Sequence, residues 1–119
     1  MLHRLLLRLY ESAEKPGMKN SPESTESRQF NTARILIYGR VQGVSFRRFA
    51  ASCAAKTGIN GYVRNLNDGR SVEAIVQGSP ASLDSFLRLL EKGPPDSLIE
   101  KIIVGKICPE QLYNSFDIR

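Results

Sequence analysis

The alternation of two apolar periodicities after Ala33 most strongly limits what this chain can fold into. Residues 33–41 carry apolar side chains at even spacing, which is typical of a half-buried strand. From Phe46 the spacing becomes helical, on a face shared by Phe46, Phe49, Ala50 and Cys53. We expect this helix to follow an N-cap at Ser45 and to stop at Gly58.

Two further strands, a second helix and two closing strands are predicted after Gly58. Residues 59–65 and 71–77 have strand patterns and are joined by a turn at Asn67-Asp68-Gly69. The second helix has Ser79 as its predicted cap and ends before Gly93-Pro94-Pro95. Its apolar positions follow the i, i+3, i+4, i+7 rule and are Leu83, Phe86, Leu87 and Leu90. Residues 99–107 and 116–119 complete the pattern as strands.

The order β-α-β-β-α-β predicts an α+β fold of the ferredoxin-like type. In this sandwich a mixed, largely antiparallel sheet carries both helices on one face. The first and second strands run in the same direction, because a right-handed crossover through the first helix joins them. Their carboxyl ends therefore lie at one edge of the sheet. The loop after the first strand and the last residue of the second strand should meet at that edge.

The length of 119 residues fits a single domain preceded by an extension. Residues 12–32 are polar and rich in Ser and Glu, so we interpret residues 1–32 as a flexible N-terminal extension and residues 33–119 as the folded domain. The leucines near the start are too few to span a bilayer, and no membrane span is expected.

The residue types present exclude several kinds of chemistry. The only histidine is His3, in the extension, so the domain has no imidazole for general-base catalysis. Cys53 and Cys108 are far apart and form no CxxC pair, which excludes a His/Cys zinc site. We expect no metal and no cofactor. The net charge of +5 is compatible with an anionic ligand but does not identify one.

The loop after the first strand has the features of an anion-binding turn. It reads GRVQGVSFR over residues 39–47 and leads from a strand into a helix N-terminus. Such a loop can direct several main-chain N–H groups at one anion, and the helix dipole adds favourable potential. Arg47 can hold two phosphate oxygens with its guanidinium. The loop lacks the Lys-Ser/Thr ending of a nucleotide-triphosphate loop.

Two other side chains near the same edge have competing interpretations. Asn65 ends the second strand, where an asparagine often serves only the following turn, although its carboxamide can also accept and donate hydrogen bonds in a site. Arg48 follows Arg47 by one position and points about 100° away around a helix. We expect Arg48 to be a solvated surface charge rather than a second phosphate clamp.

The stretch GRVQGVSFR, followed by GYVRNLNDG, resembles the two signature motifs of the acylphosphatase family. The 18-residue separation of Arg47 and Asn65 also fits that family's catalytic Arg and Asn, and the resemblance extends over residues 33–119. It implies metal-independent hydrolysis of acyl phosphates to a carboxylate and phosphate. Arg47 and Asn65 would be catalytic, with Asn65 positioning the attacking water. The phosphate-binding residues implied are Val41, Gln42, Gly43, Val44, Ser45, Phe46 and Arg47.

Two alternatives from other functional classes compete with this hypothesis. A non-catalytic anion-binding module would use the same loop. An RNA-binding module would use a ferredoxin-like sheet, but the predicted strand SVEAIVQ lacks the aromatic and basic residues on which bases stack, so nucleic-acid binding is not expected. The partners we expect are a small acyl phosphate and inorganic phosphate as product or inhibitor. We also expect a cytoplasmic monomer.

Overall fold

The elements occur in the predicted order in the computed structural model, which describes residues 31–109 and 111–119. They are β1 (Asn31–Arg40), α3 (Phe46–Thr57), β2 (Asn60–Asn65), β3 (Ser71–Gly78), α4 (Pro80–Leu90), β4 (Leu98–Lys106) and β5 (Phe116–Ile118). The observed bounds differ from the predicted ones by one or two residues. β1 begins at Asn31, two residues before the predicted domain boundary, and the rest of the predicted extension lies outside the described residues.

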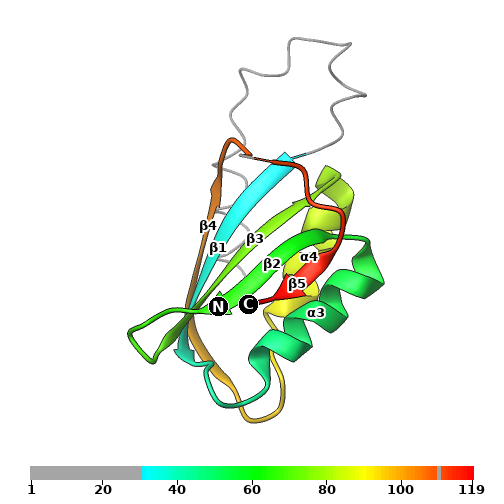
Figure 1. Cartoon of the computed structure of the whole chain (residues 1–119). Coiled ribbons are helices and arrows are strands. Elements are labelled where there is room, and N and C mark those ends of the chain that lie inside the picture. The colour runs from blue at the N-terminus through cyan, green and yellow to red at the C-terminus, as the bar shows by residue number, and fades with distance from the viewer. Residues whose placement is uncertain (1–30, 110) are drawn as a thin grey trace, which may run out of the picture.

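One mixed sheet forms the framework of the domain, with strand order β4-β1-β3-β2-β5. β3 lies between β1 and β2 and pairs antiparallel with both, while β2 pairs parallel with β5. Because β1 and β2 both oppose β3, they run in the same direction, as predicted. Both helices pack on one face of this sheet (Figure 1). The ferredoxin-like fold predicted from the element order is confirmed.

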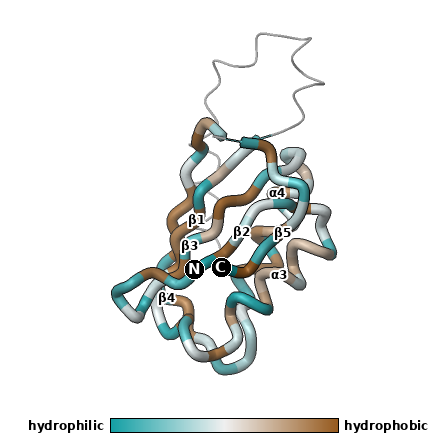
Figure 2. The backbone as a smooth tube through the Cα atoms, viewed as in Figure 1, coloured by the Kyte–Doolittle hydropathy of each residue, from teal (hydrophilic) through white to brown (hydrophobic). Residues whose placement is uncertain are grey.

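The core lies between the sheet and the two helices. Alternate residues of β1 and β3 face it, and hydrophobic stretches recur along the strands (Figure 2). The predicted apolar positions of α4 are all buried: Leu83, Phe86, Leu87 and Leu90. On α3, Phe46, Ala50 and Cys53 are buried and Phe49 packs against the core from a partly buried position. Neither helix in residues 31–109 and 111–119 is long and apolar enough to cross a membrane.

The caps of the two helices differ from each other. Ser79 caps α4 as predicted, because its side chain accepts a hydrogen bond of 3.1 Å from the Ser82 N–H. Ser45 occupies the predicted N-cap position of α3, but its side chain makes no capping hydrogen bond. The reason is conformational: Ser45 is left-handed, with φ of 64°, whereas a capping serine normally has an extended backbone.

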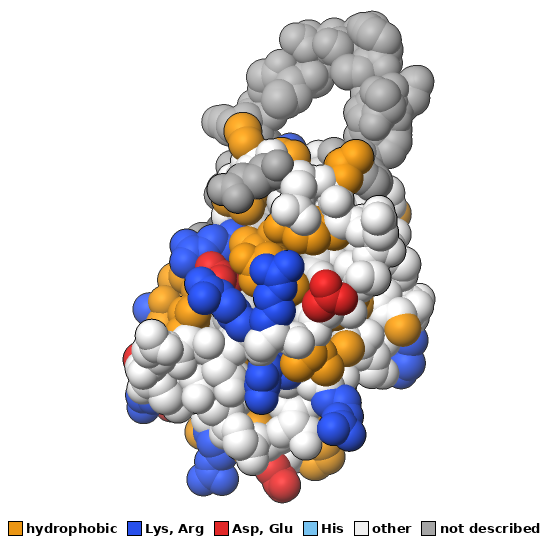
Figure 3. Space-filling view, in the orientation of Figure 1, with side chains coloured by type: hydrophobic (Ala, Val, Ile, Leu, Met, Phe, Trp, Pro, Cys, Tyr) orange, Lys and Arg blue, Asp and Glu red, His pale blue; other side chains and the backbone are white. Residues whose placement is uncertain are grey.

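The sheet face opposite the helices is covered by its own long side chains. At its centre Glu73 of β3 is only 4% exposed, and it accepts hydrogen bonds of 2.6 Å from both Arg34 of β1 and Arg64 of β2. Arg and Lys side chains gather on this face (Figure 3). Burial alone would raise the pKa of Glu73, but the two guanidinium groups outweigh it and hold the pKa below its ordinary value.

We expect Glu73→Gln to lower the free energy of unfolding at pH 7 by about 1–3 kcal/mol, because the carboxylate charge and one of its two hydrogen-bond acceptors are lost. A lowered pKa in the folded state stabilises the protein above the unfolded pKa of about 4.3, and this contribution is lost as pH falls through the folded value. Urea unfolding at pH 7 and near pH 3 measures the difference, which should shrink at the lower pH.

Glu100→Gln is the matched control for this prediction. Glu100 pairs with Arg70 at 2.9 Å, but both side chains are more than half exposed, so the loss should stay below about 1 kcal/mol. An equal deficit for Glu73→Gln at both pH values would show that the charge of Glu73 is not what stabilises the sheet.

Candidate active site

The loop between β1 and α3 has main-chain N–H groups that donate to no group in the described residues. Gly43 and Ser45 both have left-handed backbones, with φ of 75° and 64°. Backbones that turn in this way form concave nests of N–H groups that suit anions. Within residues 31–109 and 111–119, the N–H groups of residues 42–45 donate no hydrogen bond. The loop therefore presents its donors at the N-terminus of α3, as the sequence predicted.

Arg47 is held beside this loop by the end of the chain. It is the second residue of α3 and half-buried, and its Nη1 donates a hydrogen bond of 2.8 Å to the main-chain oxygen of Arg119. Arg119 is fixed in turn, because its N–H donates to the Val63 oxygen of β2 at 2.8 Å and its guanidinium lies 3.8 Å from the centre of the Tyr62 ring. The position of the Arg47 guanidinium thus depends on β2 and on the residue that follows β5.

Asn65 carries a buried acceptor that nothing in the described chain uses. It is the last residue of β2, paired with Val72 of β3, and its Oδ1 is buried without a hydrogen-bond partner. Leaving such a carbonyl oxygen buried and unpaired costs about 1–3 kcal/mol. An unsatisfied acceptor is therefore a feature that stability alone does not explain, and it is suited to hold a water molecule or a ligand donor.

Loop, helix and strand ends surround one cavity of about 330 Å³ at the predicted sheet edge. Its lining residues are Val41, Gly43, Ser45, Phe46, Arg47, Arg48, Asn65 and Ile118. Arg47 and Asn65 are thus brought together, as the parallel directions of β1 and β2 predicted. Two residues of the expected phosphate loop, Val44 and Gln42, are not part of the lining: the Val44 side chain packs against the core, and the Gln42 side chain turns elsewhere, although both were expected to act through their main-chain N–H groups.

Gln42 ties the loop to the hairpin that follows Asn65. Its Nε2 donates hydrogen bonds of 2.9 Å to the main-chain oxygens of Leu66 and Ser71. The same hairpin is closed by a bond from the Leu66 N–H to the Ser71 oxygen. Asp68 tightens its turn; hydrogen bonds from the Arg70 N–H and the Ser71 hydroxyl lower the Asp68 pKa. The glutamine was predicted to serve through its main chain, and this side-chain link was not predicted.

Arg48 and Ile118 line the cavity although the sequence did not indicate either. Arg48 is exposed, as expected of a solvated surface charge, and the first turn of α3 contributes both Arg47 and Arg48 to the lining. Ile118 reaches the cavity because β5 pairs with β2. The sequence of a three-residue strand is too short to predict this pairing. In the described residues, no group of three or more His, Cys, Asp and Glu side chains is placed to hold a metal ion.

Comparisons with known proteins identify the family to which this domain belongs. The acylphosphatase family model matches residues 33–118. An acylphosphatase of Synechococcus sp. is 46% identical over 85 residues, which are 71% of this chain and 88% of that protein. One from Anaeromyxobacter dehalogenans is 42% identical, over 73% of this chain and 92% of its own length.

The solved structure of an acylphosphatase from Bacillus subtilis superposes with a TM-score of 0.71 at 36% identity, over 75% of this chain and 98% of that one. Since the family model spans residues 33–118 and a solved acylphosphatase has the same fold at 36% identity, the chain belongs to the acylphosphatase family and hydrolyses acyl phosphates.

Proposed function

We propose that Arg47 and the main-chain N–H groups of residues 41–46 bind the phosphoryl group, while Asn65 orients the attacking water. The observation that supports this most directly is the shared cavity. Among the described residues, its lining includes the guanidinium groups of Arg47 and Arg48, loop N–H donors without a partner and the unpartnered Oδ1 of Asn65, and it includes no acidic side chain. Donors suit a phosphoryl dianion, and a lone acceptor suits a water proton.

The reaction needs few groups besides Arg47, the loop N–H groups and Asn65. The water oxygen forms a bond to phosphorus, the bond from phosphorus to the bridging oxygen breaks, and the carboxylate leaves with the electron pair. One water proton stays on the new hydroxyl and the other goes to a phosphoryl oxygen, so an acyl phosphate dianion gives a carboxylate and dihydrogen phosphate. A carboxylate is a good leaving group, because the pKa of its acid is about 4, and no general acid is required.

Catalysis then rests on position and charge. Phosphoryl transfer passes through a loose transition state whose equatorial oxygens carry negative charge. Arg47 and the loop N–H groups stabilise that charge from fixed positions, since the loop is shaped by its backbone and Arg47 is anchored to Arg119. Inorganic phosphate, the product, would occupy the same donors and act as an inhibitor.

We also propose a monomer that acts in the cytoplasm. The edge strands favour a monomer: β4 carries charged residues and β5 has only three residues, and both features disfavour pairing with another sheet. Cys53 and Cys108 are free thiols, which suits a reducing compartment.

The first experiment is hydrolysis of an aryl acyl phosphate in the presence of EDTA. We expect wild-type turnover to persist in the chelator. Arg47→Ala should lose at least about 100-fold in turnover and should also bind phosphate more weakly, because a donor at developing charge is removed. Asn65→Ala should lose a similar factor in kcat while phosphate affinity, measured by titration calorimetry, changes little. Retained kcat with weakened phosphate binding in Asn65→Ala would reverse the roles assigned here.

A second prediction concerns Gln42. Gln42→Ala removes both bonds between the loop and the hairpin, so Asn65 is held less firmly relative to Arg47. We expect kcat to fall by about tenfold with a change in phosphate affinity below about threefold, because small misplacements cost rate more than binding. Asn60→Ala is the matched control, since its amide donates a similar bond of 3.0 Å to the Tyr113 oxygen but does not line the cavity. Equal kinetic losses in both variants would contradict a positioning role for Gln42.

A further inference from the structure

Arg48 differs from the other described arginines in lining the cavity while having no partner among residues 31–109 and 111–119. It is the third residue of α3 and exposed, and it lines the cavity with Arg47 and Asn65. The guanidinium groups of Arg34, Arg64, Arg70 and Arg88 bind carboxylates. Arg47 binds a main-chain oxygen and Arg119 lies on an aromatic ring.

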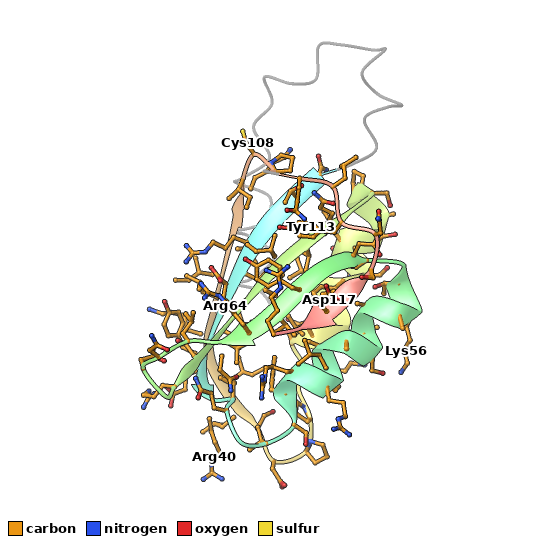
Figure 4. All side chains as sticks on the ribbon, in the orientation of Figure 1. Arg40, Lys56, Arg64, Cys108, Tyr113 and Asp117 are labelled. Atoms are coloured by element: carbon orange, nitrogen blue, oxygen red, sulfur yellow. The ribbon has the colours of Figure 1, made fainter. Side chains whose placement is uncertain are left out.

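Among the arginines of residues 31–109 and 111–119, only Arg40 and Arg48 make no such contact. Arg40 is exposed, projects away from the body of the domain and is not part of the cavity lining (Figure 4). Of the two cations that line the cavity, Arg47 makes a hydrogen bond to the Arg119 main-chain oxygen, and Arg48 makes no hydrogen bond or ion pair with a described group. Because no acidic side chain of the described residues lines the cavity, the guanidinium of Arg48 is free to donate hydrogen bonds to an anionic ligand.

The cavity also has more room than the phosphoryl group needs. Its volume of about 330 Å³ falls at the lower end of the range for whole small-molecule ligands. With the phosphoryl group on Arg47 and the loop, the rest of the volume is left to the acyl part of the substrate. That part meets two chemically different groups of the lining, the cationic Arg48 and the apolar Ile118, which is 48% exposed.

Successive positions on a helix diverge by about 100°, so extended side chains place the guanidinium groups of Arg47 and Arg48 roughly 12 Å apart. This separation is enough for one ligand to carry an anion to each of them. A benzoyl group with a carboxylate opposite its acyl phosphate has this reach once each anion sits a few ångströms from its guanidinium.

We infer that Arg48 is a specificity residue which binds a second negative group on the acyl part of the substrate. The inference rests on the proposed placement of the phosphoryl group at Arg47. The preferred substrates are then acyl phosphates whose acyl part carries a carboxylate or another anion, rather than neutral acyl phosphates. The distal anion takes no part in the bonds that form and break, so Arg48 acts on selection and not on the chemical step.

The test uses two aryl acyl phosphates of the same shape. 4-Carboxybenzoyl phosphate carries the distal anion, and 4-methylbenzoyl phosphate replaces it by a neutral methyl group. For each we compare kcat/KM in the wild type, Arg48→Gln and the matched control Arg40→Gln, which removes the other unpartnered arginine. In Arg48→Gln we expect kcat/KM to fall about five- to tenfold for the carboxylated substrate and to stay within twofold for the methyl substrate. Arg40→Gln should leave the ratio of the two substrates within twofold of wild type.

Added salt provides an independent readout. Raising ionic strength from about 20 to 200 mM should reduce the preference of the wild type for the carboxylated substrate and should not change the ratio in Arg48→Gln. An equal loss for both substrates in Arg48→Gln, or no loss for either, would overturn the inference. The proposed site is tested separately, because Asn65→Ala must slow both substrates whatever Arg48 does.

Discussion

The central position of β3 is the constraint on which the rest of the structure depends. Because β3 pairs antiparallel with β1 and β2, the chain leaves both flanking strands at the same edge of the sheet. A loop that leads into a helix N-terminus and a strand that ends in Asn65 are thereby directed at one cavity. The parts of the site come from positions far apart in the sequence, and hydrogen bonds across this edge hold them in register: Gln42 to the hairpin, and Arg47 to Arg119.

Features with a local cause could be predicted from the sequence, and those that depend on distant neighbours could not. The apolar faces of both helices and the Ser79 cap follow from nearby residues alone, and they agree with the structure. Ser45 has the right residue type for a cap, but the loop imposes a left-handed backbone that a residue pattern does not reveal. The meeting of Arg47 and Asn65 was predictable because it follows from topology rather than from side-chain packing.

The cavity wall was harder to predict for a related reason. Ile118 belongs to β5, which has only three residues, and the sequence of so short a strand does not show that it pairs with β2. Helical geometry correctly predicted that Arg48 is exposed, but it gives only the direction of Arg48 relative to Arg47 and does not show that Arg48 also lines the cavity. The side-chain bonds of Gln42 reach carbonyl groups 24 and 29 residues away, beyond any local motif.

The open face of the sheet also bears on the RNA-binding alternative. Tyr62 and Tyr38 are the rings on which bases could stack, but Arg119 covers one and Lys101 lies 5.1 Å from the centre of the other. Arg34 and Arg64 are shared with Glu73, which neutralises part of their charge. That this domain does not bind nucleic acids stays a prediction, and these intramolecular contacts support it.

The contact between Arg47 and the Arg119 oxygen has a practical consequence for handling the protein. Any residues joined after Arg119, such as a purification tag or a fused domain, would start beside the cavity and at the group that orients Arg47. Cys108, by contrast, lies at the other end of the sheet (Figure 4) and is exposed, so a fluorescent label or a surface tether attached there would leave the mouth of the cavity open.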